Sequence, residues 1–340
     1  MGTLKSITTS REEYQSMKST TKVPRNVNVL ILAGYRTGST ILSELFMRNP
    51  DAYYIFEPGF LLELDNCSHE FSTFTRSAEL TRFLNVLYTC DFENETSQCY
   101  FDAAEVMRGT IRFNVRWTIK MRLGLNYANI SKMNLTEYCL QHPITAVKTI
   151  RVEKISQVVP LMRDPKIDLK VIDLVRDPRG KASSVLTIKD ELSEKMLLRS
   201  IEHYCSLGME NIAIGKSMDE WLRHNYIAVR YEDFANKPIE VTQKLYTTLG
   251  LELPPDLIPW LTINTSHDGH GNAYSTTRDS KVTAHAWRRN LSIRTIQRIE
   301  NIQACRVFMN YTGYGLVDGR HNLLNDSSIS FLESRPEWFL

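Results

Sequence analysis

Apolar residues gather in short runs that alternate with amphipathic stretches along most of the chain. Apolar runs bounded by charged or turn-forming residues predict strands near residues 27–33, 52–56, 144–149, 168–175 and 225–230. Apolar positions at helical spacing predict helices near residues 40–48, 153–163, 178–189, 193–218, 236–249 and 293–311. This alternation predicts an α/β fold with a mainly parallel central sheet covered by helices on both faces.

A turn of small and polar residues, GYRTGST at 34–40, follows the first predicted strand and leads into a predicted helix. The first turn of a helix has unpaired backbone N–H groups and a partial positive charge, so strand–turn–helix geometry of this kind binds phosphate. We therefore expect a phosphate site here. The alternative is a turn that is merely rich in small residues.

The turn differs from the phosphate loop of nucleotide triphosphatases. That loop has a glycine, four further residues and then Gly-Lys-Ser/Thr, whereas Gly38 of this chain is followed directly by Ser39. Arg36 is the cation inside the turn. Because no lysine is placed for β- and γ-phosphates, the sequence argues against a triphosphate ligand.

A second turn, RDPRG at 176–180, follows the strand predicted at 168–175. Asp177 suits the N-cap of the next helix and Pro178 suits its first position. Arg176 at the end of the strand and Ser184 in the second helical turn are placed to converge on one phosphate. Alone, such a turn is an ordinary capped helix start; beside the first turn, it predicts a second phosphate site on the same sheet edge.

Two phosphate turns without a triphosphate loop indicate a nucleotide phosphorylated at both ends. With these motifs the chain resembles the sulfotransferases and, more narrowly, the Golgi carbohydrate 6-O-sulfotransferases that act on galactose, N-acetylgalactosamine or N-acetylglucosamine. The resemblance runs from about Asn26 to Val317. Further family-like pieces follow in family order: FEP at 56–58, VKTIRV at 147–152, VRYEDFANKP at 229–238 and TTRDSKVTAHAWRRNL at 276–291.

The resemblance implies the P-loop-containing nucleotide-binding fold of sulfotransferases and an enzyme that uses 3′-phosphoadenosine-5′-phosphosulfate (PAPS), without a metal. The residues it assigns to the 5′-phosphosulfate are those of the first turn: Arg36, Thr37, Gly38, Ser39 and Thr40. It assigns the 3′-phosphate to Arg176 and Ser184. The acceptor it implies is a glycan or glycosaminoglycan hydroxyl, at the 6-position of the sugar.

Three residues late in the family-like stretches are further candidates for the donor site. Tyr231 suits an adenine contact, because aromatic faces stack on bases, or is a core tyrosine with a satisfied hydroxyl. Arg278 resembles the basic residue that closes over the 3′-phosphate. We expect Trp287 to pack the closing loop rather than to touch the donor.

Sulfuryl transfer is an in-line displacement in which negative charge grows on the leaving phosphate, so catalysis requires positioning and nearby cations. We expect Arg36 to stabilise the leaving group. The resemblance assigns the general base to Glu57, and its apolar neighbours suit that role. The alternative is a strand-end carboxylate paired with an arginine. Lys148 and Arg151 either face the sulfuryl group or an anionic sugar chain, or are solvated charges.

Two rival functions remain open at this stage. A P-loop kinase of a small metabolite lacks its Gly-Lys-Ser/Thr, and a non-catalytic glycan-binding protein on the same scaffold would not need Arg36 and Glu57. His267 and His270 lack a cysteine or third histidine nearby, so we predict no metal site.

The two phosphate turns lie far apart in sequence yet must share one sheet, which predicts a single sulfotransferase domain over 26–318 with an insertion at about 59–142. A polar N-terminal segment, 1–25, is expected to be disordered, and residues 319–340 form a C-terminal tail. Net charge is +2, which indicates no nucleic-acid partner. A local basic cleft is predicted from Arg151, Arg176, Arg179, Arg278, Arg288 and Arg289.

The compartment follows from sequons and cysteines. Eight N-x-S/T triplets favour a secretory route with surface glycans. They begin at Asn66, Asn94, Asn129, Asn134, Asn264, Asn290, Asn310 and Asn325. Of six cysteines, Cys205 and Cys305 are predicted to pair. The resemblance implies the Golgi, although residues 1–25 contain neither a signal-like apolar core nor a membrane anchor. The oligomeric state is left open.

Overall fold

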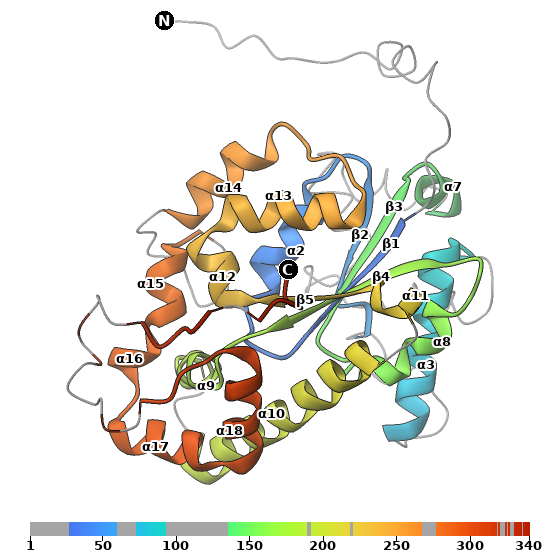
Figure 1. Cartoon of the computed structure of the whole chain (residues 1–340). Helices are drawn as coiled ribbons and strands as arrows, with labels where there is room; N and C mark the ends of the chain where they lie inside the picture. The colour runs from blue at the N-terminus through green and yellow to red at the C-terminus, as the bar shows by residue number, and fades with distance from the viewer. Residues whose placement is uncertain are drawn as a thin grey trace, which may run out of the picture.

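A parallel sheet with helices on both faces forms the centre of the computed structural model (Figure 1). The structure describes residues 27–59, 73–92, 135–188, 192–217, 220–266 and 277–317, and beyond them 319, 324, 326, 330–334 and 336–340. Its strands are β1 (Val27–Ala33), β2 (Ala52–Phe56), β3 (Ile144–Thr149), β4 (Asp168–Val175) and β5 (Tyr226–Arg230). They lie in the order β2-β3-β1-β4-β5 and pair in parallel throughout, which confirms the predicted α/β class.

The strands form where the apolar runs predicted them, and only β5 begins one residue later than expected. Every residue of β1 is buried, as expected for a central strand covered on both faces. Successive side chains point to opposite faces, so Leu30 and Leu32 enter one core while Val29 and Ile31 enter the other. The strand order reverses at β1, which is where open α/β sheets form their ligand crevice.

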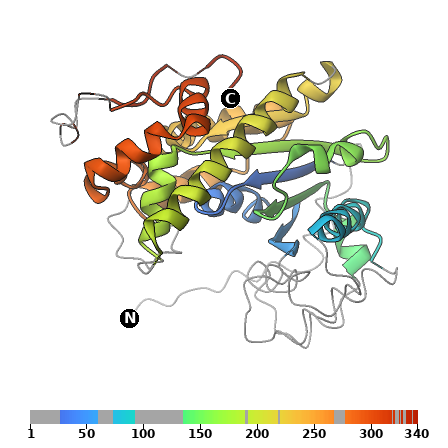
Figure 2. The same cartoon turned by 90° about the horizontal axis from the view of Figure 1, so that it is seen from below.

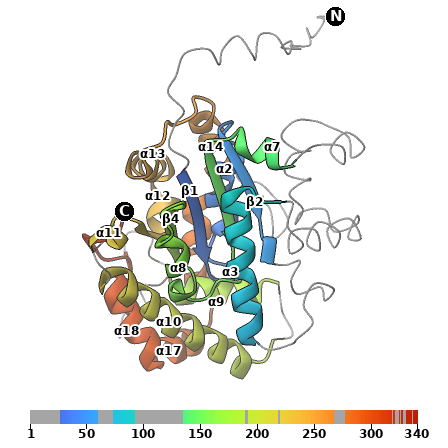
Figure 3. The same cartoon turned by 90° about the vertical axis from the view of Figure 1, so that its right-hand side faces the viewer.

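Different helices cover the two faces of the sheet (Figure 1, Figure 3). One face packs against α3 (Thr73–Thr89), the 3₁₀ turn η3 (Ile155–Gln157) and α8 (Val159–Met162). The other packs against α2 (Ser39–Met47), α12 (Tyr231–Asn236), α13 (Pro238–Leu249) and α14 (Leu257–Thr265). Burial on both faces holds the carboxyl ends of the strands at a single edge.

A third core cluster lies beyond β4 and β5, around a pair of helices joined by a disulfide. Its helices are α9 (Pro178–Leu186), α10 (Glu194–Ser217), α17 (Ile293–Asn301) and α18 (Gln303–Thr312). Seen from below, α10 (yellow-green) runs beside α18 (red) (Figure 2). Cys205 of α10 is bonded to Cys305 of α18, so the predicted pairing is confirmed.

Two predicted helices are each broken in two. The first becomes η3 and α8, because Pro160 in the first turn of α8 cannot continue a helix from the preceding turn. The second becomes α17 and α18, with Ile302 extended between them. Its apolar stripe changes phase: helical spacing from Ile299 would bury residue 303, whereas Cys305 is the buried residue. One straight helix could not bury both halves.

Several shorter helices lie outside the predicted set. They are α7 (Leu135–Leu140), α11 (Glu220–Arg223), α15 (Ser280–His285) and α16 (Trp287–Asn290), besides α12 and α14. A second disulfide, Cys90–Cys139, ties the end of α3 to α7. The predicted segment 1–25, and residues 60–72 and 93–134 of the predicted insertion, lie outside the described residues. None of the helices within the described ranges combines the length and apolar content needed to cross a bilayer.

Candidate active site

The two predicted phosphate turns meet at the carboxyl ends of the neighbouring strands β1 and β4. Arg36 Nε donates to Ser184 Oγ at 3.0 Å, and Arg176 Nη1 donates to the Arg36 carbonyl at 3.0 Å. Lys181 Nζ donates to the Tyr35 carbonyl at 2.6 Å. Side chains of the second turn and of the helix after it therefore donate hydrogen bonds to the main chain of the first turn. We call Arg36, Arg176 and Lys181 the donor edge.

The first turn is held in a conformation that few residues adopt. Arg36 has a φ of 65°, and Gly38, the N-cap of α2, has a φ of 90°. A Cβ at Gly38 would lie 2.3 Å from the ring of Tyr231, so only glycine fits there. The Thr37 side chain and N–H both donate to the Gly34 carbonyl, which closes the turn. Such strain is found where a ligand site requires it, and it presents the N-terminus of α2, with Ser39 and Thr40, at the edge.

The second turn confirms the predicted helix start. Asp177 caps α9, since its carboxylate accepts the Arg179 N–H, and Pro178 is the first helical residue. Arg176 is 5% exposed, and its Nη2 donates to the Thr283 carbonyl. Its Nε is buried without a hydrogen-bond partner among the described residues. A buried donor left unpaired is costly, so this atom is suited to an anion.

Two of the three cations of the donor edge have no carboxylate partner among the described residues. Neither Arg176 nor Lys181 forms an ion pair within the described part of the chain. Burial, together with the charges of Arg176 and Arg36, lowers the pKa of Lys181 to about 8. The nearby Glu232 carboxyl has its pKa raised to about 7 by burial and by Asp177, so it offsets the positive charge only in part. The edge is built to receive negative charge.

Tyr231 packs inside this edge. The Arg176 guanidinium lies 4.5 Å from its ring centroid, on the same ring that abuts Gly38. Burial raises the pKa of the Tyr231 hydroxyl, while the charges of Arg176, Arg278 and Arg36 act to lower it. The contacts described for Tyr231 are with the protein, so its role toward adenine stays a prediction, as does the assignment of Arg278 to the 3′-phosphate.

Glu57 lies at the end of β2, in a second cluster of charges. Its Oε1 accepts from Lys148 Nζ at 2.5 Å, its Oε2 accepts from Arg151 Nη1 at 2.7 Å, and the Ile150 N–H donates to the carboxylate. The Glu57 side chain is 3% exposed and its φ is 47°. Burial lowers the pKa of Lys148, and the Glu57 charge acts to raise it. Glu57 therefore forms an ion pair with an arginine, which is the alternative to a general base that the sequence left open. It forms a second ion pair with Lys148.

The predicted basic cleft is wrong for Arg179. This side chain is fully buried, donates to Asp177 and Glu300 at 2.7 Å each, and donates to the Gly315 carbonyl. We call Asp177, Arg179 and Glu300 the arginine brace. Of its two carboxylates, Asp177 is a sequence neighbour, whereas Glu300 lies too far along the chain for the local pattern to reveal it. Trp287 stacks on Arg179 at 4.1 Å and is buried, so it packs as expected.

Two other members of that predicted cleft show no hydrogen bond to the donor edge among the described residues. Arg288 donates to the carbonyls of Leu324 and Asp326, and Arg289 is exposed. Lys181, by contrast, was missed by the sequence reasoning. A signal for it existed, because Lys181 precedes Ser184 by three residues and so shares a face of the predicted helix. No cluster of metal-ligating side chains occurs within the described ranges, and His267 and His270 lie outside them.

This chain is similar in sequence to known sulfotransferases. A family model described as "Sulfotransferase family" matches residues 152–255. Carbohydrate sulfotransferase 1 of Mus musculus is 30% identical over 357 residues, covering 92% of this chain and 84% of the relative. The Danio rerio protein of the same name is 29% identical, covering 92% and 83%. Carbohydrate sulfotransferase 3 of Mus musculus is 27% identical, covering 92% and 73%.

Among solved structures, a sulfotransferase domain from the curacin biosynthetic pathway matches 87% of this chain and 100% of its own, at 16% identity and a TM-score of 0.47. A score this low carries no argument, so the assignment depends on the sequence relatives. Each of these relatives aligns with 92% of this chain. The chain belongs to the carbohydrate sulfotransferase family.

Proposed function

We propose that the protein transfers a sulfuryl group from PAPS to the 6-hydroxyl of galactose, N-acetylgalactosamine or N-acetylglucosamine in a glycan or glycosaminoglycan. The observation that carries the proposal is the contact between the two anion-binding turns, through Arg36 with Ser184 and Arg176 with the Arg36 carbonyl. A nucleotide with phosphates at both ends fits two such turns on adjacent strands.

The donor edge fits PAPS by the chemistry of its groups. The buried Arg176 Nε lacks a partner within the described residues and is suited to the 3′-phosphate. Ser184, which accepts from Arg36, is the second group that we assign to that phosphate. The N-terminus of α2 and Arg36 are suited to the 5′-phosphosulfate. PAPS supplies an activated sulfuryl group whose leaving group is a phosphate. Arg36 stabilises the charge that develops on that phosphate.

The acceptor side uses the Glu57 cluster. Glu57 takes the proton of the sugar hydroxyl as its oxygen bonds to sulfur, while the bond from sulfur to the leaving phosphate oxygen breaks. Among the described residues, Glu57 is the one carboxylate that Lys148 contacts. When Glu57 accepts the proton it loses the charge that Lys148 neutralises. The Lys148 ammonium then becomes available to the transferring group, at the stage when negative charge develops there.

The Golgi lumen is the compartment that we propose. Two sequon asparagines, Asn290 and Asn310, lie exposed on the surface, where glycans would be accommodated. The Cys205–Cys305 and Cys90–Cys139 disulfides require an oxidising compartment. Members of the resembled family act on glycans in that compartment, which agrees with both features.

Transfer of radiolabelled sulfate from PAPS tests the proposal. Chondroitin, keratan and N-acetylglucosamine-terminated acceptors form the panel, and release of label by a 6-O-specific sulfatase locates the product. We expect transfer to at least one acceptor without added metal. Calorimetry provides the second measurement: tight binding of ATP with Mg²⁺ together with no binding of 3′,5′-ADP would indicate the kinase alternative and overturn the proposal.

Replacement of Glu57 by glutamine tests the base. Glu57→Gln keeps the size of the side chain and one acceptor oxygen but cannot take a proton, so we expect transfer to fall about 10²–10⁴-fold. The affinity for 3′,5′-ADP should stay near that of the wild type, because the change lies at β2 rather than at the donor edge. An active Glu57→Gln variant would assign the base to another residue.

A further inference from the structure

Tyr204 of α10 makes both of its hydroxyl hydrogen bonds to the main chain of Arg176. The hydroxyl donates to the Arg176 carbonyl at 2.9 Å and accepts from the Arg176 N–H at 2.8 Å. Arg176 follows the last residue of β4, where the pairing of β4 with β5 ends at Val175. The tyrosine therefore supplies the hydrogen bonds that the sheet no longer provides, and without it two main-chain groups would lose their partner.

The same ring also touches the first turn. A Cβ at Gly34 would lie 3.1 Å from the Tyr204 ring, and Lys181 Nζ lies 5.0 Å from the ring centroid. Burial raises the pKa of the Tyr204 hydroxyl, so the group stays a neutral donor and acceptor across the physiological range. One side chain from outside the sheet thus contacts both phosphate turns.

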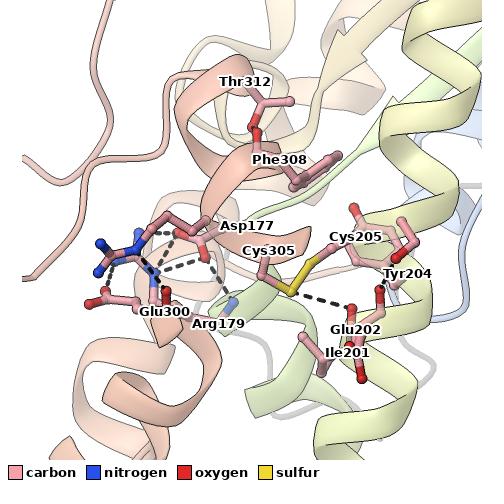
Figure 4. The surroundings of a disulfide bond; sticks show 12 residues. Asp177, Arg179, Ile201, Glu202, Tyr204, Cys205, Glu300, Cys305, Phe308 and Thr312 are labelled. Carbon is pink, nitrogen blue, oxygen red and sulfur yellow. Dashed lines mark hydrogen bonds and ion pairs between the residues drawn. A yellow bond between two sulfur atoms is a disulfide. The ribbon is translucent and has the colours of Figure 1, made fainter. Parts of the chain in front are cut away.

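The neighbouring residue anchors Tyr204 covalently. Cys205 is bonded to Cys305 of α18, and Figure 4 shows Tyr204 and this bond on α10, with the arginine brace next to them. The Cys305 sulfur also contacts the Ile201 carbonyl, one helical turn before Cys205. The position of the Tyr204 hydroxyl is consequently fixed by a cross-link, rather than by the packing of α10 alone.

We propose that Tyr204 is a positioning residue for recognition of the donor's 3′-phosphate, because its hydroxyl fixes the main chain from which Arg176 projects. The proposal depends on the proposed function in one respect: Arg176 must be the residue that binds that phosphate. Tyr204 needs no contact with the donor itself. Its effect on the ligand is transmitted through Arg176. Loss of the hydroxyl should therefore weaken the binding of a ligand that carries the 3′-phosphate more than the binding of one that lacks it.

Tyr204→Phe separates this role from a purely structural one, because it removes the hydroxyl and keeps the ring against Gly34. Calorimetry with 3′,5′-ADP and with 5′-AMP compares ligands that differ in the 3′-phosphate. We expect the Kd of 3′,5′-ADP to rise about tenfold, as for loss of buried hydrogen bonds, and the Kd of 5′-AMP to stay unchanged. In an Arg176→Met background, Tyr204→Phe should cause no further loss.

Tyr88→Phe is the matched control, since Tyr88 is a buried tyrosine whose hydroxyl donates to the Val29 carbonyl on β1. We expect it to lower the melting temperature, by less than Tyr204→Phe because one hydrogen bond is lost instead of two, and to change neither Kd. Equal weakening of both ligands by Tyr204→Phe, or weakening of neither, would overturn the role of Tyr204. A wild-type protein that does not prefer 3′,5′-ADP to 5′-AMP would instead overturn the assignment of Arg176 and, with it, this inference.

Discussion

The donor edge and the arginine brace each take an arginine from the same short turn, Arg176 and Arg179, yet the protein neutralises only one of these two charges. Arg179 of the brace is fully buried between two carboxylates, with a carbonyl and an indole ring completing its surroundings. Arg176, three residues earlier, has no carboxylate bound to it within the described residues and has a buried Nε without a partner. The protein itself supplies the charge and hydrogen-bond partners of Arg179, whereas Arg176 has a donor group available for an external anion.

The presence or absence of carboxylate partners, rather than exposure, is the basis on which we propose a structural role for Arg179 and a ligand-binding role for Arg176. Both side chains are buried, at 0% and 5% exposure. What distinguishes them is whether the protein itself satisfies the guanidinium. A site that must bind a highly charged donor accepts repulsion among its own cations, which shows in the lowered pKa of Lys181. The brace keeps the turn folded in spite of that repulsion.

Removing the brace should produce the largest effect. Arg179→Met leaves two buried carboxylates without their cation, so we expect the free energy of unfolding to fall by about 3–5 kcal/mol. Urea denaturation measures the change. Arg298→Met is the control: it also removes an arginine–glutamate pair, but an exposed one, and should cost less than about 1 kcal/mol. Equal losses in the two variants would contradict the structural role of the brace.

Arg36→Ala is the second test, and it acts on the donor edge alone. We expect turnover to fall by roughly two to three orders of magnitude, as when a preorganised donor of positive charge is lost. The melting temperature should change little, because Arg36 is only partly buried. Arg48→Ala, on the same helix–turn unit and paired with Glu44, serves as control and should keep full turnover. Unchanged turnover in Arg36→Ala would remove Arg36 from the mechanism.

Arg176→Met tests the contrast between Arg176 and Arg179 by removing the arginine that has no carboxylate partner among the described residues. Because Arg176 has no ion pair to lose within the described chain, its replacement should leave the unfolding free energy within about 1 kcal/mol of the wild type, the scale of ordinary hydrogen bonds. The affinity for 3′,5′-ADP should nevertheless fall by one to two orders of magnitude, about the value of bonds to a charged group. Thermal melts and calorimetry on the same samples give both numbers. A large loss of stability would place Arg176 with the brace.

Lys181 should produce the smallest effect, visible mainly as a pH dependence. In the free protein its pKa is lowered to about 8, so it loses its proton as pH rises above that value; a bound anion favours the protonated form. Affinity for 3′,5′-ADP should therefore decline between about pH 8 and the ordinary lysine value of 10.5. Over the same range the ligand-free protein should gain stability, because the unfolded chain binds more protons than the folded one.

Lys181→Met should abolish that decline in affinity and weaken binding only several-fold at pH 7, as expected when one of several cations is lost. Lys237→Met, which removes an exposed lysine paired with Glu240, should retain the wild-type pH profile. Calorimetry between pH 7 and 10 gives both curves. A decline that persists in Lys181→Met would assign the titration to another group.

The sequence predicted the strands and the two phosphate turns because these features are local. A buried parallel strand is a continuous apolar run, and a capped helix start is written in neighbouring residues such as Asp177 and Pro178. Arg176 and Arg179 could not be distinguished in this way, since the partner that completes Arg179 is Glu300, far along the chain. Tyr204 escaped notice for the same reason: nothing near it in the sequence shows that its hydroxyl reaches β4.

The strand order has a consequence for how such enzymes diversify. The two phosphate turns follow β1 and β4. Glu57 and Lys148 lie at the carboxyl ends of β2 and β3, which are on the other side of β1 in the sheet. Under the proposed function, the nucleotide would bind at the ends of β1 and β4 and the sugar at the ends of β2 and β3, so the two substrates would approach each other across β1. Substitutions at the ends of β2 and β3 would then change the acceptor without touching the residues that bind the nucleotide.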